Sequence, residues 1–171
     1  VRAIHINTQN LKRLIKNNFN NALKEFIDSR LKEGKKIENV LSKKTQDIEK
    51  IARIIQKMEK KTLNKRIKNY KNKIKNLIED FDETRLDQEV AMLALRHDIS
   101  EELDRILFHT KAINEELRKK ISSGKKIDFI LQELFRESNT LAVKIDDSKL
   151  KNFALDMKLL VEEMREQTQN V

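Results

Sequence analysis

Apolar residues recur every three or four positions along most of this chain, which is the spacing that places them on one face of an α-helix. The first series continues from about Thr8 to Lys60, with Gly34 as a candidate hinge that costs about 1 kcal/mol in a helix. A second series runs from about Thr62 to Phe81 among many lysines. Because each helix has little apolar surface per turn, we expect the two to pair as a hairpin.

The apolar series become shorter after Arg85. The helices expected in this half are residues 85–95, 98–121, 126–144 and 148–167. The segment Asp98-Ile99-Ser100-Glu101 has the form of a capping box, with an acidic N-cap and a glutamate at the third helical position. We expect Ser122-Ser123-Gly124 to end that helix and Asp146-Asp147 to cap the last one.

The turn residues that sheets and hairpins require are scarce, since the chain of 171 residues has two glycines and no proline. We therefore predict an all-α fold with little or no β-sheet. Its expected domains are a long basic helical hairpin in residues 1–81 and a compact multi-helix module in residues 82–171. Because 38% of the residues are charged, we expect thin helical layers with burial at subunit contacts.

Charge is distributed unevenly along the chain. Residues 1–80 hold 22 Lys and Arg against 9 Asp and Glu, a net +13, whereas residues 81–171 hold 15 against 19, a net −4. A basic helical rod favours a polyanionic partner, because binding a phosphate backbone releases counterions. The alternative is that the lysines only keep the helices solvated, and charge alone does not separate the two interpretations.

The sequence contains no targeting or membrane signal. No apolar run is long enough to span a bilayer, and the N-terminus has no apolar region typical of a signal peptide. Because the chain begins at Val1 rather than Met, we expect a fragment or a processed product, whose trimming could have removed a leader. The absence of cysteine excludes disulfides and fits a reducing, cytoplasmic compartment.

One candidate site lies on the helix expected at residues 98–121. Its polar residues Asp98, Glu102, Arg105 and His109 follow one another at helical spacing, with Glu101 beside them. One interpretation is that Glu102 or Glu101, together with His109, supplies ligands or acid–base groups to a site completed by another helix. The other, which the spacing favours, is a capping box followed by a ladder of ion pairs.

A second polar stripe lies on the helix expected at residues 126–144, where Glu133, Arg136, Glu137 and Thr140 share one side. Two carboxylates four residues apart repel each other unless a cation lies between them. That cation is Arg136 in the structural interpretation and Mg²⁺ or Mn²⁺ in the functional one, which suits phosphodiester cleavage. Phosphate loops, zinc-ligand spacings, nucleophile elbows and an aromatic platform are absent from the sequence.

Several ordered blocks carry a family resemblance. They are Arg85-Leu86-Asp87-Gln88-Glu89-Val90, Asp98-Ile99-Ser100-Glu101-Glu102-Leu103-Asp104-Arg105 followed by His109, Gly124-Lys125-Lys126-Ile127-Asp128-Phe129, Gln132-Glu133, Arg136-Glu137-Ser138-Asn139-Thr140 with Lys144, and Met164-Arg165-Glu166-Gln167-Thr168-Gln169-Asn170. In these blocks the chain resembles the YicC/YloC family of bacterial endoribonucleases. The resemblance in sequence covers about residues 85–170. Residues 8–80 share only the general character of the family, as the long helices that precede those blocks.

The resemblance implies a metal-dependent endoribonuclease that cleaves single-stranded RNA and assembles as a homohexamer. The family positions carried over are Glu89, Asp98, Glu101, Glu102, Arg105, His109, Glu133, Arg136, Glu137, Asn139 and Lys144. The predicted catalytic and metal-binding residues are Glu102, His109, Glu133 and Glu137, and the predicted phosphate-binding residues are Arg105, Arg136 and Lys144. The expected cofactor is Mg²⁺ or Mn²⁺, and neither a membrane nor DNA is an expected partner.

The family has an α/β domain before its helical half, and this sequence lacks it, so we expect impaired activity if RNA entry or assembly requires that domain. An alternative hypothesis is a non-catalytic, oligomeric helical protein that binds RNA or acts as an adaptor. Metal-dependent cleavage of RNA would favour the enzyme, and salt-sensitive binding without cleavage would favour the adaptor. The nuclease hypothesis requires the two polar stripes to face each other or to be joined by a neighbouring subunit.

Overall fold

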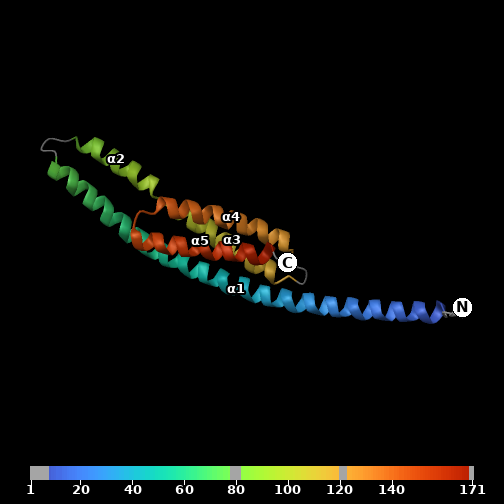
Figure 1. Cartoon of the computed structure of the whole chain (residues 1–171). Helices are drawn as coiled ribbons and strands as arrows, with labels where there is room; N and C mark the ends of the chain where they lie inside the picture. Colours follow the sequence, from blue (N-terminus) through green and yellow to red (C-terminus); the bar gives the residue numbers. More distant parts are fainter. Residues whose placement is uncertain (1–7, 78–81, 120–122, 170–171) are drawn as a thin grey trace, which may run out of the picture. The chain divides into compact units, whose positions relative to one another are not determined.

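The computed structural model describes residues 8–77, 82–119 and 123–169. The helices in these ranges are α1 (Thr8–Leu77), α2 (Glu83–Arg96), α3 (Ser100–Leu117), α4 (Gly124–Lys144) and α5 (Ser148–Gln169) (Figure 1). None of the described residues forms a strand. The predicted all-α class is therefore confirmed.

The first helix is continuous where the sequence predicted a break. α1 has 70 residues and runs through both Gly34 and Thr62. The Thr62 hydroxyl donates a 3.1 Å hydrogen bond to the carbonyl of Met58, one turn earlier, so Thr62 remains inside the helix instead of starting a new one. The hairpin expected within residues 1–81 therefore does not form at this point.

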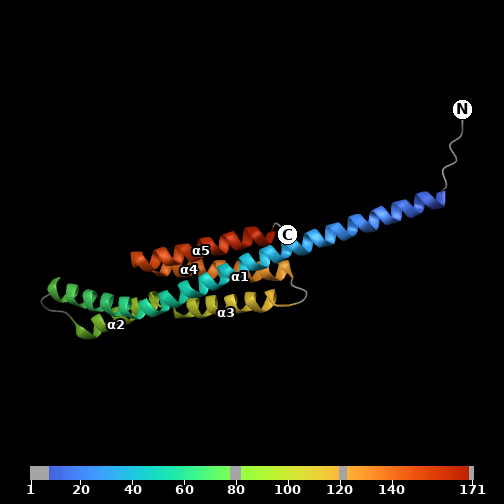
Figure 2. The same ribbon diagram turned by 90° about the horizontal axis from the view of Figure 1, so that it is seen from below.

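α2 is the first helix after α1 to lie beside it. Lys71 Nζ lies 2.7 Å from Asp87 Oδ1, and Figure 2 shows α2 next to the C-terminal part of α1. Asp82 caps α2, because its side chain accepts hydrogen bonds from the backbone N–H groups of Thr84 and Arg85. The expected helix ends at Phe81 and Ile121, and Ser122 of the expected breaker, lie outside the described residues.

The chain divides into two compact units, residues 1–39 and residues 40–171. The boundary expected from the change in charge lies between residues 81 and 82. It differs because residues 40–77 of α1 contribute to the core of the second unit, for example through Leu41, Ile48 and Ile55, which are buried. The net charge of the chain changes sign near residue 81, whereas side chains become buried from about residue 40 onwards.

Within the second unit, α4 packs against α3 on one side and α5 on the other. The largest fully buried side chains are Ile48, Ile55, Ile99, Leu103, Ile106, Ile113, Leu131, Leu134, Leu141, Met157, Val161 and Met164. The buried hydroxyls of Thr45, Thr110 and Ser138 donate to carbonyls of their own helices, so they add no unsatisfied donor to this core.

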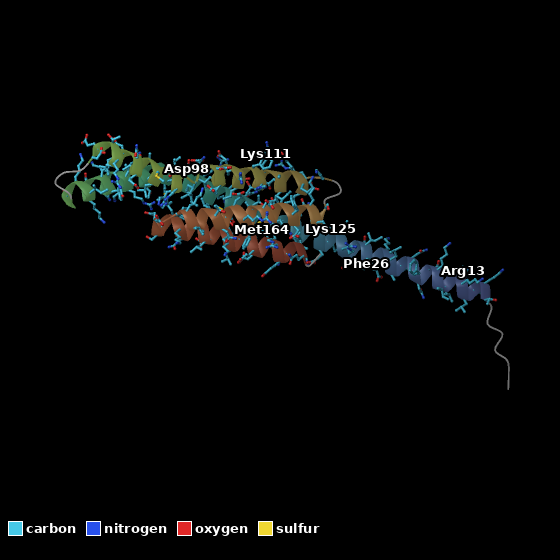
Figure 3. The ribbon with its side chains drawn as sticks, turned by 90° about the horizontal axis from the view of Figure 1, so that it is seen from above. Arg13, Phe26, Asp98, Lys111, Lys125 and Met164 are labelled. Atoms are coloured by element: carbon cyan, nitrogen blue, oxygen red, sulfur yellow. The ribbon has the colours of Figure 1, made fainter. Side chains whose placement is uncertain are left out.

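The first unit presents a different surface. From Thr8 to Lys36 every residue of α1 is exposed. The large apolar side chains exposed on it are Leu11, Leu14, Ile15, Phe19, Leu23, Phe26, Ile27 and Leu31, which we call the exposed stripe. Arg13 and Phe26 mark this segment in Figure 3.

Two of the predicted caps differ in detail. The predicted capping box, with Asp98 as the N-cap, does not form: α3 begins at Ser100, Ile99 is its N-cap residue, and no side chain caps it. Asp98 Oδ1 instead accepts a 2.8 Å hydrogen bond from the Ser100 N–H. Asp147 caps α5 by accepting from the N–H groups of Lys149 and Leu150, as predicted. Gly124 is the first residue of α4 rather than the end of the preceding helix.

No helix in residues 8–77, 82–119 and 123–169 is both long and apolar enough to cross a lipid bilayer.

Candidate functional site

α3 and α4 pack side by side in opposite directions. Asp98 lies at one end of this pair and Lys125 at the other (Figure 3). Arg105 Nη1 is 3.0 Å from Glu137 Oε1, and Lys126 Nζ is 3.0 Å from Glu116 Oε2. The two pairs are separated by the same number of residues on each helix, so the register between the helices is constant. The two predicted polar stripes therefore face each other.

We call this double row the polar seam. Its members, defined by the ion pairs between the two helices and by helical spacing, are Asp98 just before α3, Glu102, Arg105, His109 and Glu116 of α3, and Lys126, Glu133, Glu137 and Lys144 of α4.

Arg105 occupies the middle of the polar seam. Its guanidinium contacts Glu101 on its own helix and Glu137 on α4, at 2.5 Å and 3.0 Å. The hydrogen bond with Glu137, together with the charge of Glu101, raises the pKa of Arg105. The Glu137 side chain is only 12% exposed, so Arg105 neutralises a carboxylate that is largely removed from water.

The sequence assigned the cation beside Glu137 to Arg136 in the structural interpretation, and the structure has Arg105 there instead. Arg136 is turned to solvent, with its side chain 75% exposed, and its Nη1 lies 3.2 Å from Glu133 Oε1. Helical rotation explains the difference, because adjacent residues point about 100° apart.

Lys144 and Glu102 form a second pair across the polar seam. Lys144 Nζ lies 2.7 Å from Glu102 Oε1 and donates a 3.0 Å hydrogen bond to the carbonyl of Asp98. The Glu102 side chain is 9% exposed, and its Oε2 is buried with no hydrogen-bond partner among the described residues. Such an atom costs free energy unless a donor reaches it, so it is a point of high affinity for a donor or a cation.

His109 lies one helical turn beyond Arg105, and Glu133 lies one turn before Glu137. The constant register therefore places His109 and Glu133 at the same level of the polar seam. Both are half-buried, and the His109 ring stands edge-on to Phe108, with 5.6 Å between the ring centroids. A ligand can therefore reach the side chains of His109 and Glu133, whereas the carboxylate of Glu102 is buried.

Glu116 and Asp98 mark the two ends of the polar seam. Glu116 accepts from Lys119 at 2.6 Å and from Lys126 at 3.0 Å, and these contacts lower its pKa to about 2. Hydrogen bonds from Ser100, with a smaller contribution from Lys144, lower the pKa of Asp98. Both carboxylates are therefore ionised at neutral pH and serve as fixed negative charges.

The predicted metal ligands do not form one cluster. Among residues 8–77, 82–119 and 123–169, no three His, Asp or Glu side chains gather in a way that could hold a metal ion. The carboxylates of Glu102, Glu133 and Glu137 are each paired with a basic side chain. The three predicted phosphate ligands are those same basic groups: Arg105, Arg136 and Lys144.

Sequence reasoning missed a polar contact on the other side of α4. Asp128 Oδ1 and Arg165 Nε are buried, lack hydrogen-bond partners in the described part of the chain and lie 3.9 Å apart. Asp128 also accepts from Gln132 at 2.8 Å. Both partners belong to the blocks quoted above, but no sequence spacing connects α4 to α5.

Two of the carried-over positions lie away from the polar seam. Glu89 is exposed on α2. Asn139 follows Asp128, Gln132 and Phe135 at helical spacing, so it belongs to the side of α4 that meets Arg165.

Known proteins resemble this chain over most of its length. Residues 48–171 match the family described as "Endoribonuclease YicC-like, C-terminal". A protein named "Probable endoribonuclease YicC" from Haemophilus influenzae is 34% identical over 153 residues, which cover 90% of this chain and 53% of that protein. A protein of the same name from Clostridioides difficile is 34% identical over 160 residues, covering 88% and 52%. The chain thus spans about half the length of these relatives, and the family match includes the whole polar seam.

Proposed function

Since the chain belongs to the family of YicC-like endoribonucleases, we propose that it is the helical part of an endoribonuclease and that its polar seam binds and cleaves single-stranded RNA. The observation that carries the proposal is the pairing of Arg105 with Glu137 and of Lys144 with Glu102 across two helices. Basic and acidic groups from separate segments are thereby held together in one row, as phosphodiester cleavage requires.

The basic groups of the polar seam suit an RNA backbone. Arg105 and Arg136 are both more than half exposed, so a phosphate can reach either guanidinium. The pair of Arg105 with Glu101 lies at the surface, with both side chains more than half exposed, so water screens it and it contributes little to stability. A phosphate can therefore replace Glu101 as a partner of Arg105 while the contact with Glu137 is kept, and it offers oxygens for a bidentate contact. Lys144 supplies a third positive charge at the end of the row.

The accessible level of His109 and Glu133 suits proton transfer. In the proposed reaction a water oxygen attacks phosphorus, one of these side chains accepts the proton of the water, and the other donates a proton to the ribose oxygen as its bond to phosphorus breaks. Imidazole and carboxylate are the groups that enzymes use for this work near neutral pH. Glu102 and Glu137, which are nearly buried and paired, hold Lys144 and Arg105 in position.

We also propose Mg²⁺ or Mn²⁺ as the cofactor. Mg²⁺ is usually held by one or two carboxylates together with substrate phosphates and water, rather than by a cage of protein ligands. The polar seam fits that mode through Glu133, the most exposed of its three candidate carboxylates, whereas Glu137 and Glu102 are nearly buried and paired with Arg105 and Lys144. The described residues hold no preformed group of three acidic or histidine ligands. When bound, the ion would neutralise charge on the phosphate and lower the pKa of a bound water. His109, the fourth predicted ligand, is a nitrogen donor and fits the proton-transfer role better.

The proposed assembly is a homo-oligomer, with six copies as the family resemblance implies, in a bacterial cytoplasm. The exposed stripe on α1 supports association, since contiguous apolar surface of this kind is typical of an interaction site. Light scattering of the full chain would give the number of copies, and a monomer at micromolar concentration would contradict the assembly.

Cleavage of a 5′-labelled, unstructured RNA tests the function. We expect activity with Mg²⁺ or Mn²⁺ and none with EDTA. Glu133→Gln and His109→Gln should each lower the rate by about 100-fold or more, as loss of a general acid or base does. Glu115→Gln is the matched control, because Glu115 is exposed on α3 and its ion pair with Lys111 lies within that helix. Cleavage in EDTA would contradict the metal proposal, and unchanged cleavage in both seam variants would contradict the site.

The adaptor remains the second candidate, and one observation favours it. The acidic groups of the polar seam are already paired with basic groups, which alone would make a stable helix contact. RNA binding that weakens steeply with salt, without cleavage under any divalent metal, would support this role and exclude the nuclease.

A further inference from the structure

Three segments of the second unit meet around His97. A small hollow is lined there by Arg66 of α1, by His97 after α2, and by Lys144 and Asp146 at the end of α4. His97 Nδ1 lies 3.0 Å from the backbone carbonyl oxygen of Lys144. A carbonyl oxygen can only accept a hydrogen bond, so Nδ1 must carry the proton and donate.

This hydrogen bond caps the end of α4. Lys144 is the last residue of that helix, so no following turn offers an N–H to its carbonyl. The nearby N–H of Ile145 already donates to Leu141, at 3.1 Å. His97 therefore supplies from another segment the donor that the helix end lacks.

Asp146 places a second acceptor beside the same ring nitrogen of His97. Asp146 Oδ2 lies 3.4 Å from His97 Nδ1 and 3.3 Å from Arg66 Nη1. Because Arg66 neutralises this carboxylate, Asp146 steadies the ring without requiring it to be charged. The imidazole is thus fixed between α1 and the α4–α5 turn, and its side chain is only 20% exposed.

Lys144 is fixed at both ends by these contacts. Its carbonyl accepts from His97, while its ammonium contacts Glu102 and the carbonyl of Asp98 at the start of α3. We propose that His97 is a positioning residue for the RNA site: by capping the Lys144 carbonyl, it keeps the Lys144 ammonium at the end of the polar seam, within reach of a phosphate. This inference rests on the proposed function of the polar seam.

Three substitutions of His97 distinguish the loss of the hydrogen bond to the Lys144 carbonyl from the loss of side-chain volume. His97→Asn places an amide N–H near the position of Nδ1, whereas His97→Gln places it near Nε2 and His97→Ala removes it. We expect His97→Gln and His97→Ala to raise KM for RNA about tenfold with kcat little changed, and His97→Asn to stay within about twofold of the unsubstituted protein. Equal damage in His97→Asn and His97→Gln, or a fall in kcat at constant KM, would overturn the proposal.

A double substitution tests whether His97 acts through Lys144. In a Lys144→Met background, His97→Gln should cause no further rise in KM, because the group that it positions is already gone. If the double variant instead raises KM by the product of the two separate factors, the two residues act independently, which would contradict the inference. Circular dichroism of each variant confirms that its helices are intact.

The tautomer of His97 supplies a readout that needs no RNA. In ¹⁵N-labelled full-length chain, the ring should be the Nδ1–H tautomer at a pH where it is neutral, and the reverse tautomer would overturn the cap. If the chain neither binds nor cleaves RNA, the proposed function fails, while the tautomer still tests the hydrogen bond from Nδ1, since the reverse tautomer would exclude the cap on α4. The two failures are therefore distinguishable.

Discussion

Two parts of α1 carry apolar residues at the same spacing but lie in different surroundings. In residues 11–31 the large apolar side chains are exposed, and Leu14 and Phe26 each keep more than half of their surface in solvent. In residues 41–55 one face is buried, with Leu41, Ile48 and Ile55 almost fully covered, while Ile54 on the neighbouring face stays 40% exposed. Helical periodicity therefore identifies an apolar face, but it does not say whether anything covers that face.

The covered part owes its burial to helices that are distant in sequence. Asn114 of α3 donates to Glu49 at 3.3 Å, and Lys44 pairs with Glu163 of α5. These contacts border the apolar side chains that α1 shares with the other helices of residues 40–171. Covering apolar surface stabilises a fold by about 25 cal/mol per Å², and the exposed stripe does not gain this within the described chain.

The largest expected effect is the loss of a fully buried side chain from the covered part. Ile55→Ala should lower the free energy of unfolding by about 3 kcal/mol, because it removes buried apolar groups and leaves a cavity. Urea denaturation followed by circular dichroism measures the difference. A loss below about 1 kcal/mol would mean that this face of α1 is not packed in solution as described.

A smaller effect is expected from an ion pair between helices, a kind of contact that residues 8–39 do not show. The lysines at Glu116 hold its pKa at about 2, below the usual 4.5, so its contribution to stability is complete above pH 4.5 and is lost as the pH falls towards 2. Glu116→Gln should flatten the acid limb of a plot of stability against pH in that window.

Glu33→Gln is the matched control for this prediction. Glu33 pairs only with Lys36 on the same helix, and both side chains are exposed, so the acid limb should not change. An unchanged acid limb in Glu116→Gln as well would show that the ion pair with Lys119 and Lys126 does not persist in solution.

The smallest expected effect is in the exposed stripe. Leu14→Ala should change the free energy of unfolding by less than about 0.5 kcal/mol in dilute protein, since Leu14 keeps more than half of its surface in solvent. The measurement should be repeated at increasing protein concentration. A loss that grows with concentration would show that a second copy covers the stripe, and a loss as large as that of Ile55→Ala in dilute protein would remove the contrast between the two parts of α1.

Much of the candidate site was predictable from local spacing and from the family blocks. Asp98, Glu102, Arg105 and His109 share one stripe, as their intervals of three and four residues require. On α4 the structural interpretation placed Arg136 between Glu133 and Glu137, but Arg136 points to solvent and Arg105 of α3 reaches Glu137. His97 was missed, since its role depends on a carbonyl distant in the sequence.

The sequence by itself determined the helical class, the faces of the helices and the residues that could carry chemistry. These follow from backbone preferences and from a repeat of 3.6 residues per turn, which act within a few residues of each position. Tertiary structure alone decided that α1 continues through Thr62, that Arg105 rather than Arg136 reaches Glu137, and that His97 caps α4. Those outcomes depend on the register between helices, which is set by how side chains from distant segments fill a shared core.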